Sequence, residues 1–452
     1  MAVGANVASH SDPANRHQAG TTVVEPRDKA AHTDSHAYEF FGPHVPAALI
    51  VVLPLVLYGL VYACNSQGCL QLYPSLSIPG FPPDQKLWST EAFAVYLGWV
   101  LGLALLHRLL PGRSVQGVVL PNGTRLTYKL NAFPLFVSIY SIALILGFGT
   151  RQLPLGWLYD HYLELLSASV VVSSSLGLAL WLASFRPGVM LSGHGNSGWP
   201  WYDCWMGREL NPRLWGVDLK EFCELYPGMI GWALLNLGLA HKQWTDSGSI
   251  TTAIILVNLF QLYYVVDALW NEASILTTMD ITTDGFGYML AFGDLAWVPF
   301  VFSTSTRFLV DTPQALSPAF TAAILGVKLL GYWIFRGANG QKDAFRRDPS
   351  HPSVAHLRTL PTERGTRLII SGWWGASRHI NYLGDWIMGL SWCLPCGLDG
   401  LKSVLPYMYC IYFAVLLVHR ERRDDMACRA KYGKDWDKYR AIVKYRIIPY
   451  LY

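Results

Sequence analysis

Residues 46–65, with the sequence PAALIVVLPLVLYGLVYACN, contain no charged side chain and are long enough to cross a lipid bilayer as a helix. Comparable apolar stretches recur along the 452-residue chain, in which only 15% of the residues are charged. Soluble domains carry about 25%. The sequence therefore predicts an all-α polytopic membrane protein with about ten transmembrane helices, at 46–65, 91–110, 132–149, 162–185, 226–241, 251–270, 288–308, 317–335, 383–397 and 404–419.

The polar parts of the chain predict its organisation and its topology. Residues 1–40 are polar and aperiodic, so we expect a disordered tail ahead of one multi-span domain, 41–452. Lysine and arginine concentrate in the loop 336–372 and after residue 420, and positively charged loops of this kind stay in the cytosol. With ten spans, both termini are expected to face the cytosol.

Composition argues against two classes of partner. The formal net charge is +4 without a lysine or arginine run of the type that binds nucleic acid, and the eight cysteines lack zinc-site spacing. We therefore expect no nucleic-acid partner and no metal. Cys64 and Cys69 could pair if their loop faces an oxidising lumen, whereas Cys393 and Cys396 are expected to be buried, inert thiols.

The stretch GHGNSG, residues 193–198, formally matches the G-x-G-x-x-G pattern of dinucleotide-binding loops. That pattern binds a dinucleotide only between a buried strand and the start of a helix. Here a polar loop precedes it and Trp199-Pro200-Trp201 follows it, so we expect no Rossmann site.

Ionisable residues inside the apolar segments are candidates for chemistry, because each costs at least about 2.5 kcal/mol at membrane depth. Tyr264, Asp267 and Asn271 fall on one face of a helix. A phenol beside a carboxylate can act as a relayed proton donor, and hydrogen bonding between helices is an equal alternative. Glu272 and Asp294 are reserve candidates for the same role.

Three segments in the last third of the chain carry groups that suit an anionic nucleotide. Lys342 and Arg346 are one helical turn apart and could clamp a phosphate, although positive-inside bias explains them equally well. The stretch SGWWGASRHINYLGDW, 371–386, offers stacking faces, a cation and an amide. A stripe on the following helix carries an acid, a base and two phenols: Asp424, Cys428, Lys431 or Tyr432, Asp435 and Tyr439. Together these groups could hold a nucleotide cofactor against a membrane face.

Several long motifs resemble the sterol reductases of the endoplasmic reticulum. The resemblance runs from about residue 40 to the end and is closest to the delta-14 branch, which includes the sterol reductase half of the lamin B receptor. The matching motifs are GRELNPR (207–213), DALWNEASILTTMDI (267–281), FRGANGQKDAFRR (335–347), SGWWGASRHINYLGD (371–385), LLVHRERRDDMACRAKYGKDWDKY (416–439) and YRIIPYLY (445–452).

This resemblance implies an enzyme of the endoplasmic reticulum membrane that uses NADPH to reduce the C14=C15 double bond of delta-8,14 sterols in sterol biosynthesis. It implies protonation at C15, hydride addition at C14, and a cytosol-facing cofactor pocket in the C-terminal half, about 251–452. For the proton donor we expect Tyr264, oriented by Asp267. The implied cofactor residues are Lys342, Arg346, Ile369, Trp374, Asn381, Tyr382, Asp424, Cys428, Arg429, Ala430, Lys431, Tyr432 and Tyr439, with Arg378 and His379 lining or bracing the same pocket.

Three alternatives remain open at this point. The same apparatus would serve another sterol double-bond reductase, of the delta-7 or C-24(28) type. Membrane methyltransferases have a related C-terminal half, but a Lys342/Arg346 clamp suits the phosphates of NADPH better than a cofactor without phosphates. A sterol-binding scaffold without activity is disfavoured, because Lys342, Trp374 and Tyr439 are all retained.

Overall fold

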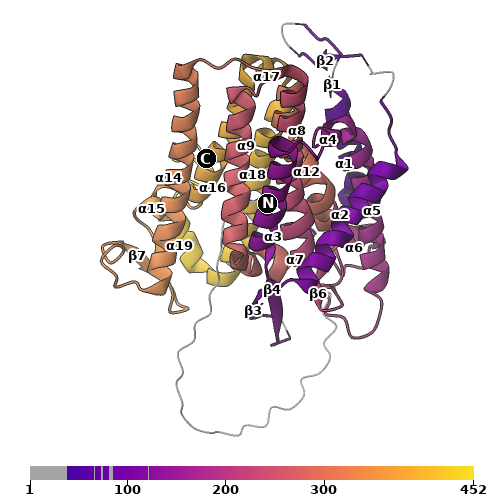
Figure 1. Ribbon diagram of the computed structural model, residues 1–452. Coiled ribbons are helices and arrows are strands. Elements are labelled where there is room, and N and C mark those ends of the chain that lie inside the picture. The colour runs from indigo at the N-terminus through magenta and orange to yellow at the C-terminus, as the bar shows by residue number, and fades with distance from the viewer. Residues whose placement is uncertain (1–37, 66, 73–74, 81–84, 121) are drawn as a thin grey trace.

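The structure is a computed structural model, and it describes residues 38–452 apart from 66, 73–74, 81–84 and 121. Residues 1–37, most of the predicted tail, lie outside the described residues. The described chain is a bundle of helices that run between two ends, with short loops and small strand pairs at each end (Figure 1).

Among the described residues, six helices are long and apolar enough to cross a membrane. They coincide with six of the ten predicted spans, and the third continues into the π-helical turn η1 (Ile145–Gly149). The prediction of a polytopic helical membrane protein is confirmed at this level. The six are α1 (Val45–Tyr62), α2 (Thr90–Leu109), α3 (Ala132–Leu144) with η1, α5 (Tyr162–Ala183), α9 (Thr252–Trp270) and α14 (Pro318–Arg347).

The other four predicted spans are helical but broken or partly polar, so ten spans stays a prediction. Two of them contain π-helical turns, one ends in a 3-10 turn, and the last continues into a charged helix. Their elements are η2 (Glu224–Ile230) with α8 (Gly231–Ser247), then α11 (Tyr288–Phe292), η4 (Gly293–Trp297), α12 (Val298–Phe302) and α13 (Thr304–Asp311), then α16 (Ile380–Cys393) with η5 (Leu394–Cys396), and η6 (Leu405–Tyr407) with α18 (Met408–Tyr432).

The fold is not purely α-helical, because the described residues include four two-stranded antiparallel sheets. The largest pairs β3 (Arg113–Val119) with β4 (Arg125–Leu130) around Asn122-Gly123, a dipeptide typical of tight hairpin turns. The prediction overlooked this turn because it read only long apolar runs. The smaller pairs are β1 (Cys64–Asn65) with β2 (Gly68–Cys69), β5 (Arg213–Leu214) with β6 (Val217–Asp218), and β7 (Thr359–Pro361) with β8 (Arg367–Ile369).

Short helices connect the long ones. They are α4 (Trp157–Asp160), α6 (Pro200–Met206), α7 (Leu219–Cys223), η3 (Glu272–Thr277), α10 (Met279–Thr282), α15 (Trp373–Ala376), α17 (Gly397–Ser403) and α19 (Lys434–Ile442).

Helix α14 is positioned by its first turn and by two glycines. Ser317 caps it by accepting a hydrogen bond from the amide of Phe320, and Pro318 occupies the first turn, where its missing N–H costs nothing. Further along, α14 crosses α16 with the backbones in contact. A Cβ on Gly331 would lie 2.8 Å from the Gly384 carbonyl oxygen, and one on Gly384 would lie 2.6 Å from the Phe335 nitrogen. This crossing fixes the last third of the chain around α14.

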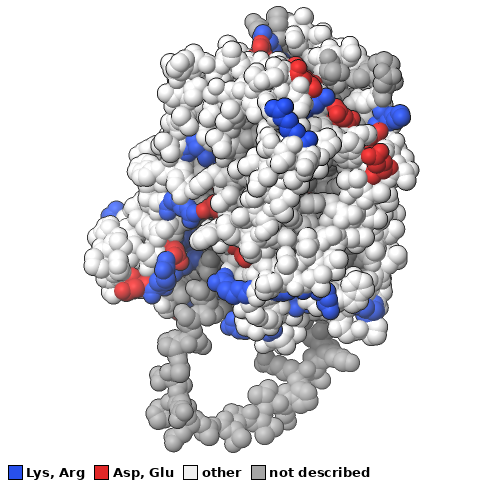
Figure 2. All heavy atoms as spheres, viewed as in Figure 1, with Lys and Arg blue, Asp and Glu red and all other residues white. Residues whose placement is uncertain are grey.

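The two ends of the bundle differ in chemistry. A disulfide joins Cys64 and Cys69 at the end that carries α17, and the amide of Leu72 donates to the Lys402 carbonyl there. The strands β3 and β4 and the β7–β8 loop lie at the opposite end (Figure 1). Lysine and arginine side chains gather along that opposite end in Figure 2, whereas acidic and basic side chains mix at the other. The free thiols of Cys393 and Cys396 are buried, as expected.

Candidate active site

The last turns of α14 bring two cations and an indole together. Lys342 lies with its Nζ 4.1 Å from the centre of the Trp374 ring, and Arg346 follows one turn later. Trp374 is buried and donates from Nε1 to the carbonyl of Ala338 at 2.8 Å, so the ring cannot swing away. The structure therefore places Lys342 beside the Ser371–Trp386 segment, and Arg346 interacts electrostatically with Cys428 and Tyr432 of the helix Met408–Tyr432.

The start of α16 meets α18 through a buried hydrogen bond. Tyr382 donates from its hydroxyl to a carboxylate oxygen of Asp424 at 2.8 Å, and its ring stacks on the imidazole of His379 with centres 4.8 Å apart. Asn381, the neighbouring residue, donates from Nδ2 to Asn339 of α14 at 3.3 Å. Three helices thus converge on one buried polar patch.

Burial of this patch shifts the pKa values of its ionisable groups. Burial, with the nearby cations of Lys342 and Arg378, lowers the pKa of His379 to about 3, so its ring is neutral at physiological pH. Burial raises the pKa of the Asp424 carboxyl, although the Tyr382 hydrogen bond and Arg420 oppose that shift. Burial also raises the pKa of the Cys428 thiol to about 11, so it stays protonated.

An aromatic stack forms where α19 meets the end of α18. The rings of Trp436 and Tyr439 on α19 stack with centres 4.9 Å apart, and Cys428 and Tyr432 pack against this cluster. Ile369, at the end of β8, is buried in the neighbouring cluster around Trp374. Arg429, Ala430 and Lys431 complete the predicted set and lie exposed on the last turn of α18. The structure thus gathers the predicted cofactor residues around the meeting point of α14, α16, α18 and α19.

Arg378 occupies a different position within this group. Its guanidinium donates to the carbonyls of Val443 at 3.2 Å and Lys444 at 3.4 Å, and lies 3.5 Å from the buried carboxylate of Glu421. Arg446 also donates to Glu421, at 2.9 Å. Arg378 therefore braces the carboxyl-terminal segment against α18, and its expected place at the cofactor pocket stays a prediction.

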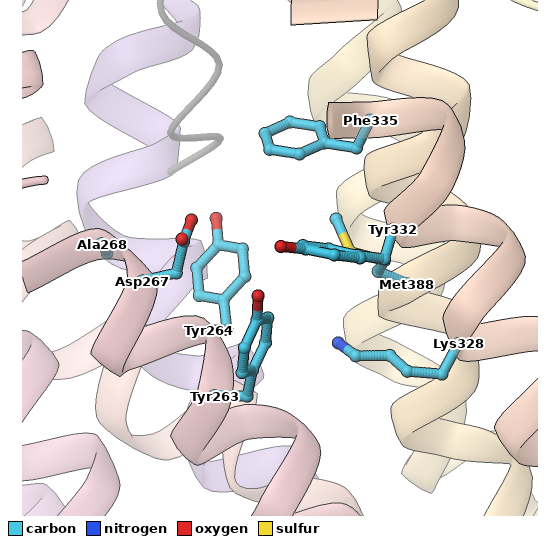
Figure 3. Close-up of a pocket in the computed structure, with 8 residues that line it drawn as sticks. All are labelled: Tyr263, Tyr264, Asp267, Ala268, Lys328, Tyr332, Phe335 and Met388. Atoms are coloured by element: carbon cyan, nitrogen blue, oxygen red, sulfur yellow. The ribbon is translucent and has the colours of Figure 1, made fainter. Parts of the chain in front are cut away.

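Tyr264 and Asp267 line a pocket between α9, α14 and α16 (Figure 3). The Tyr264 ring lies edge-on to Trp392, with centres 5.3 Å apart. Asp267 forms an ion pair with Arg336 of α14 and also accepts a hydrogen bond from Asn271. Asp267 is thus held between two helices on the wall that carries the Tyr264 phenol.

The two reserve candidates lie elsewhere. Glu272 accepts a hydrogen bond from the amide of Ala132 at 2.8 Å, so it serves the start of α3. Asp294 is buried in the π-helical turn η4, where its Oδ1 has no hydrogen-bond partner among the described residues.

Sequence reasoning missed two buried charges near this pocket, Lys328 on α14 and Asp385 on α16. They are 7% and 2% exposed. A signal existed for the lysine, because Lys328, Tyr332 and Arg336 recur every four residues along one face of an apolar helix.

The glycine-rich loop 193–198 does not present its backbone amides to a phosphate. The amides of Ser197 and Gly198 donate to the two carboxylate oxygens of Asp203, at 2.8 and 3.0 Å. A carboxylate of the chain itself thus takes the position of an anion. Among residues 38–452, with the gaps given above, no cluster of histidine, cysteine and acidic side chains has a metal-binding arrangement.

Comparison with known proteins gives consistent matches over nearly the whole chain. The sequence profile of the Ergosterol biosynthesis ERG4/ERG24 family matches residues 50–452. The Delta(14)-sterol reductase erg24 of Schizosaccharomyces pombe is 44% identical over 431 residues, which cover 94% of this chain and 99% of the relative. The Delta(14)-sterol reductase TM7SF2 of Mus musculus is 49% identical over 418 residues, covering 92% and 97%. The Delta(14)-sterol reductase LBR of Gallus gallus is 45% identical over 412 residues, covering 90% of this chain and 63% of the relative.

Proposed function

The chain belongs to the Ergosterol biosynthesis ERG4/ERG24 family, and on that premise we propose that it is a delta(14)-sterol reductase that uses NADPH. The observation that carries this proposal is the sequence identity of 44% and 49% to two delta(14)-sterol reductases along almost their full lengths. The reaction saturates the C14=C15 double bond of a delta-8,14 sterol within the membrane.

The residues around Lys342 fit a phosphorylated nucleotide. Lys342 and Arg346 lie one turn apart and repel one another, and a phosphate between them would relieve that repulsion. The ring of Trp374 and the stacked rings of Trp436 and Tyr439 offer flat faces for a base or a nicotinamide. We assign the cofactor site to this group, with Ile369, Asn381, Tyr382, Asp424 and the Cys428–Tyr432 turn around it.

Tyr264 is the proposed proton donor. Transfer of its phenolic proton to C15 breaks the O–H bond and leaves a tertiary, allylic cation at C14, and bound NADPH supplies the hydride that adds there. An ordinary phenol, with a pKa of about 10, is a weak acid for an alkene. We therefore propose that Asp267, held in place by Arg336, takes a proton from solvent and passes it to the phenolate, which restores the phenol, while Trp232 and Trp392 pack against the Tyr264 ring as an apolar wall.

The test is reduction by the purified protein in detergent, read by mass spectrometry. A delta-8,14 sterol with NADPH should gain two mass units, and a delta-5,7 sterol should not. Tyr264→Phe should lower kcat at least 100-fold without changing NADPH binding. Reduction of the delta-5,7 sterol alone would instead identify the delta-7 activity, and binding of NADPH without reduction of either sterol would favour a scaffold.

We also propose that the protein lies in the endoplasmic reticulum membrane with the Lys342 end and both termini in the cytosol. The Cys64–Cys69 disulfide at the opposite end supports this, because disulfides persist in the oxidising lumen. Asn122-Gly-Thr124 is a natural glycosylation sequon at the proposed cytosolic end, and Ser75→Asn creates another in the Cys69 loop. Glycosylation of the Ser75→Asn variant alone is expected, and a glycan on Asn122 would reverse the orientation.

A further inference from the structure

Lys328 is a buried cation that the proposed reaction does not use. It lies on α14, is 7% exposed, and its Nζ has no hydrogen-bond partner among the described residues. Its nearest groups are aromatic, since Nζ lies 5.4 Å from the ring centre of Phe260, 5.7 Å from Tyr263 and 5.6 Å from Trp392. An N–H group buried without an acceptor is costly, so a partner from outside the chain would stabilise it.

Asp385 supplies the complementary group. It is 2% exposed, and its Oδ2 has no hydrogen-bond partner in the part of the chain that the structure describes. Lys328 and Asp385 lie within one turn of the Gly331–Gly384 crossing, where α14 and α16 touch, and they interact electrostatically. A donor without an acceptor and an acceptor without a donor thus face each other across two packed helices.

Lys328 belongs to the pocket of the proposed proton donor, and Asp385 interacts with it electrostatically from α16. Lys328 points into the space that Tyr263, Tyr264 and Tyr332 also line (Figure 3). The indole of Trp392 lies near both side chains, with its ring centre 5.6 Å from Lys328 Nζ and 5.3 Å from the centre of the Tyr264 ring. Lys328 on α14 and Tyr264 on α9 thus line one pocket, so a single molecule could reach both.

A sterol has the shape and the polarity to do so. It is a rigid hydrocarbon of four fused rings with one hydroxyl on ring A, distant from the C14=C15 bond at the junction of rings C and D. We propose that Lys328 and Asp385 recognise this hydroxyl, with Lys328 donating a hydrogen bond to its oxygen and Asp385 accepting one from its hydrogen. The inference rests on the proposed function, because it assumes a sterol with its C14=C15 bond at Tyr264.

The proposal makes the hydroxyl a determinant of specificity. Sites built to hydrogen-bond a hydroxyl reject analogues that lack it, because their own polar groups are then left unpaired. The wild-type protein should reduce a 3-deoxy delta-8,14 diene with a kcat/KM about 10- to 100-fold below that of the 3-hydroxy diene. The loss should fall mainly on KM, since the hydroxyl is remote from the reacting carbons.

Lys328→Met keeps much of the volume of the side chain and removes the donor. We expect this variant to reduce the 3-hydroxy diene as poorly as the 3-deoxy diene, with NADPH binding unchanged. Lys402→Met is the matched control, because Lys402 is exposed on α17 and pairs only with Asp399 among the described groups. The control should keep the wild-type preference for the hydroxyl.

Each outcome is decisive. Equal kcat/KM for the two dienes in the wild-type protein would overturn the inference and leave the proposed function standing, as would a Lys328→Met variant that still prefers the hydroxyl. If Lys328→Met does not fold, the wild-type comparison alone decides. If the wild-type protein reduces neither diene, the proposed function fails, and retention of each tritiated diene by the immobilised protein then tests hydroxyl recognition directly.

Discussion

The hydroxyl of Tyr382 donates a 2.8 Å hydrogen bond to Asp424, and this bond ties α16 to α18 at the floor of the proposed cofactor site. Both side chains are buried, at 3% and 7% exposure. The bond therefore fixes the relative position of two helices that each contribute proposed cofactor residues.

Replacing Tyr382 with phenylalanine tests the weight of this bond. The buried Asp424 carboxylate loses a donor, and leaving such a group short of a partner costs about 1–3 kcal/mol. We expect a lower thermal unfolding temperature in detergent and at least fivefold weaker NADPH binding by titration. Tyr407→Phe is the control, because Tyr407 donates to Gly397 at the far end of the bundle, and it should leave NADPH binding unchanged. A Tyr382→Phe variant with wild-type affinity would contradict this role.

Lys342 and Arg346 should discriminate NADPH from NADH if one of them contacts the additional phosphate. Lys342→Ala and Arg346→Ala are each expected to raise KM for NADPH about 10- to 100-fold, because a charge-assisted hydrogen bond is lost. The variant that loses the contact to the additional phosphate should barely change KM for NADH. Initial rates at several salt concentrations measure both effects, with Lys402→Ala as the control. If KM rises equally for NADPH and NADH in both variants, Lys342 and Arg346 instead contact the phosphates that the two cofactors share.

His379 predicts a pH dependence of stability. Its pKa is about 3 in the folded protein and near 6.5 when unfolded, so at pH values between these the unfolded chain binds the additional proton. Stability should therefore be full above pH 6.5 and fall by up to about 1.4 kcal/mol per pH unit below it. Thermal unfolding between pH 7 and 5 measures this slope, and His379→Gln should reduce it. His351→Gln, at an exposed loop position, should not. An unchanged slope in His379→Gln would refute the neutral imidazole at this position.

The crossing of α14 and α16 predicts a steric effect at glycine. Gly384→Ala would put a Cβ 2.6 Å from the backbone nitrogen of Phe335, so the helices must separate. Overpacking of this kind typically costs about 1–3 kcal/mol, and it should also lower activity, because α16 carries Asn381 and Tyr382. Gly326→Ala, on α14, meets no atom within 4 Å and should be neutral or slightly stabilising. Equal unfolding temperatures for the two variants would contradict this contact.

The sequence predicted side-chain positions best where ionisable and aromatic residues recur at helical spacing. Lys342 and Arg346 were predicted to share a face of one helix, and α14 carries both. The stripe from Asp424 to Tyr439 was also predicted on one helix, which is wrong, because Gly433 adopts a positive φ of 52° and ends α18, so Asp435 and Tyr439 lie on α19. The structure adds that α16, in the Ser371–Trp386 segment, contacts both α14 and α18. Spacing within one helix is a local property, so it can be read directly from the chain.

The roles that escaped prediction depend on distant partners. Arg378 was identified as a cation near the cofactor, but its acceptors are the carbonyls of Val443 and Lys444, 65 and 66 residues away. Glu272 was a reserve proton donor, yet its partner is an amide 140 residues earlier. Lys328 recurs with Tyr332 and Arg336 along one face of α14, but only the packing of α9, α14 and α16 surrounds it with three aromatic rings.

In the proposed reaction the proton goes to C15 and the hydride goes to C14, and isotope labelling follows the two transfers separately. The purified protein would reduce a delta-8,14 sterol with NADPH deuterated at the transferring position, and in a second reaction with unlabelled NADPH in deuterium oxide. NMR of the products should show deuterium at C14 from the cofactor and at C15 from the solvent. Deuterium from the cofactor at C15, or no cofactor deuterium in the product, would contradict the account.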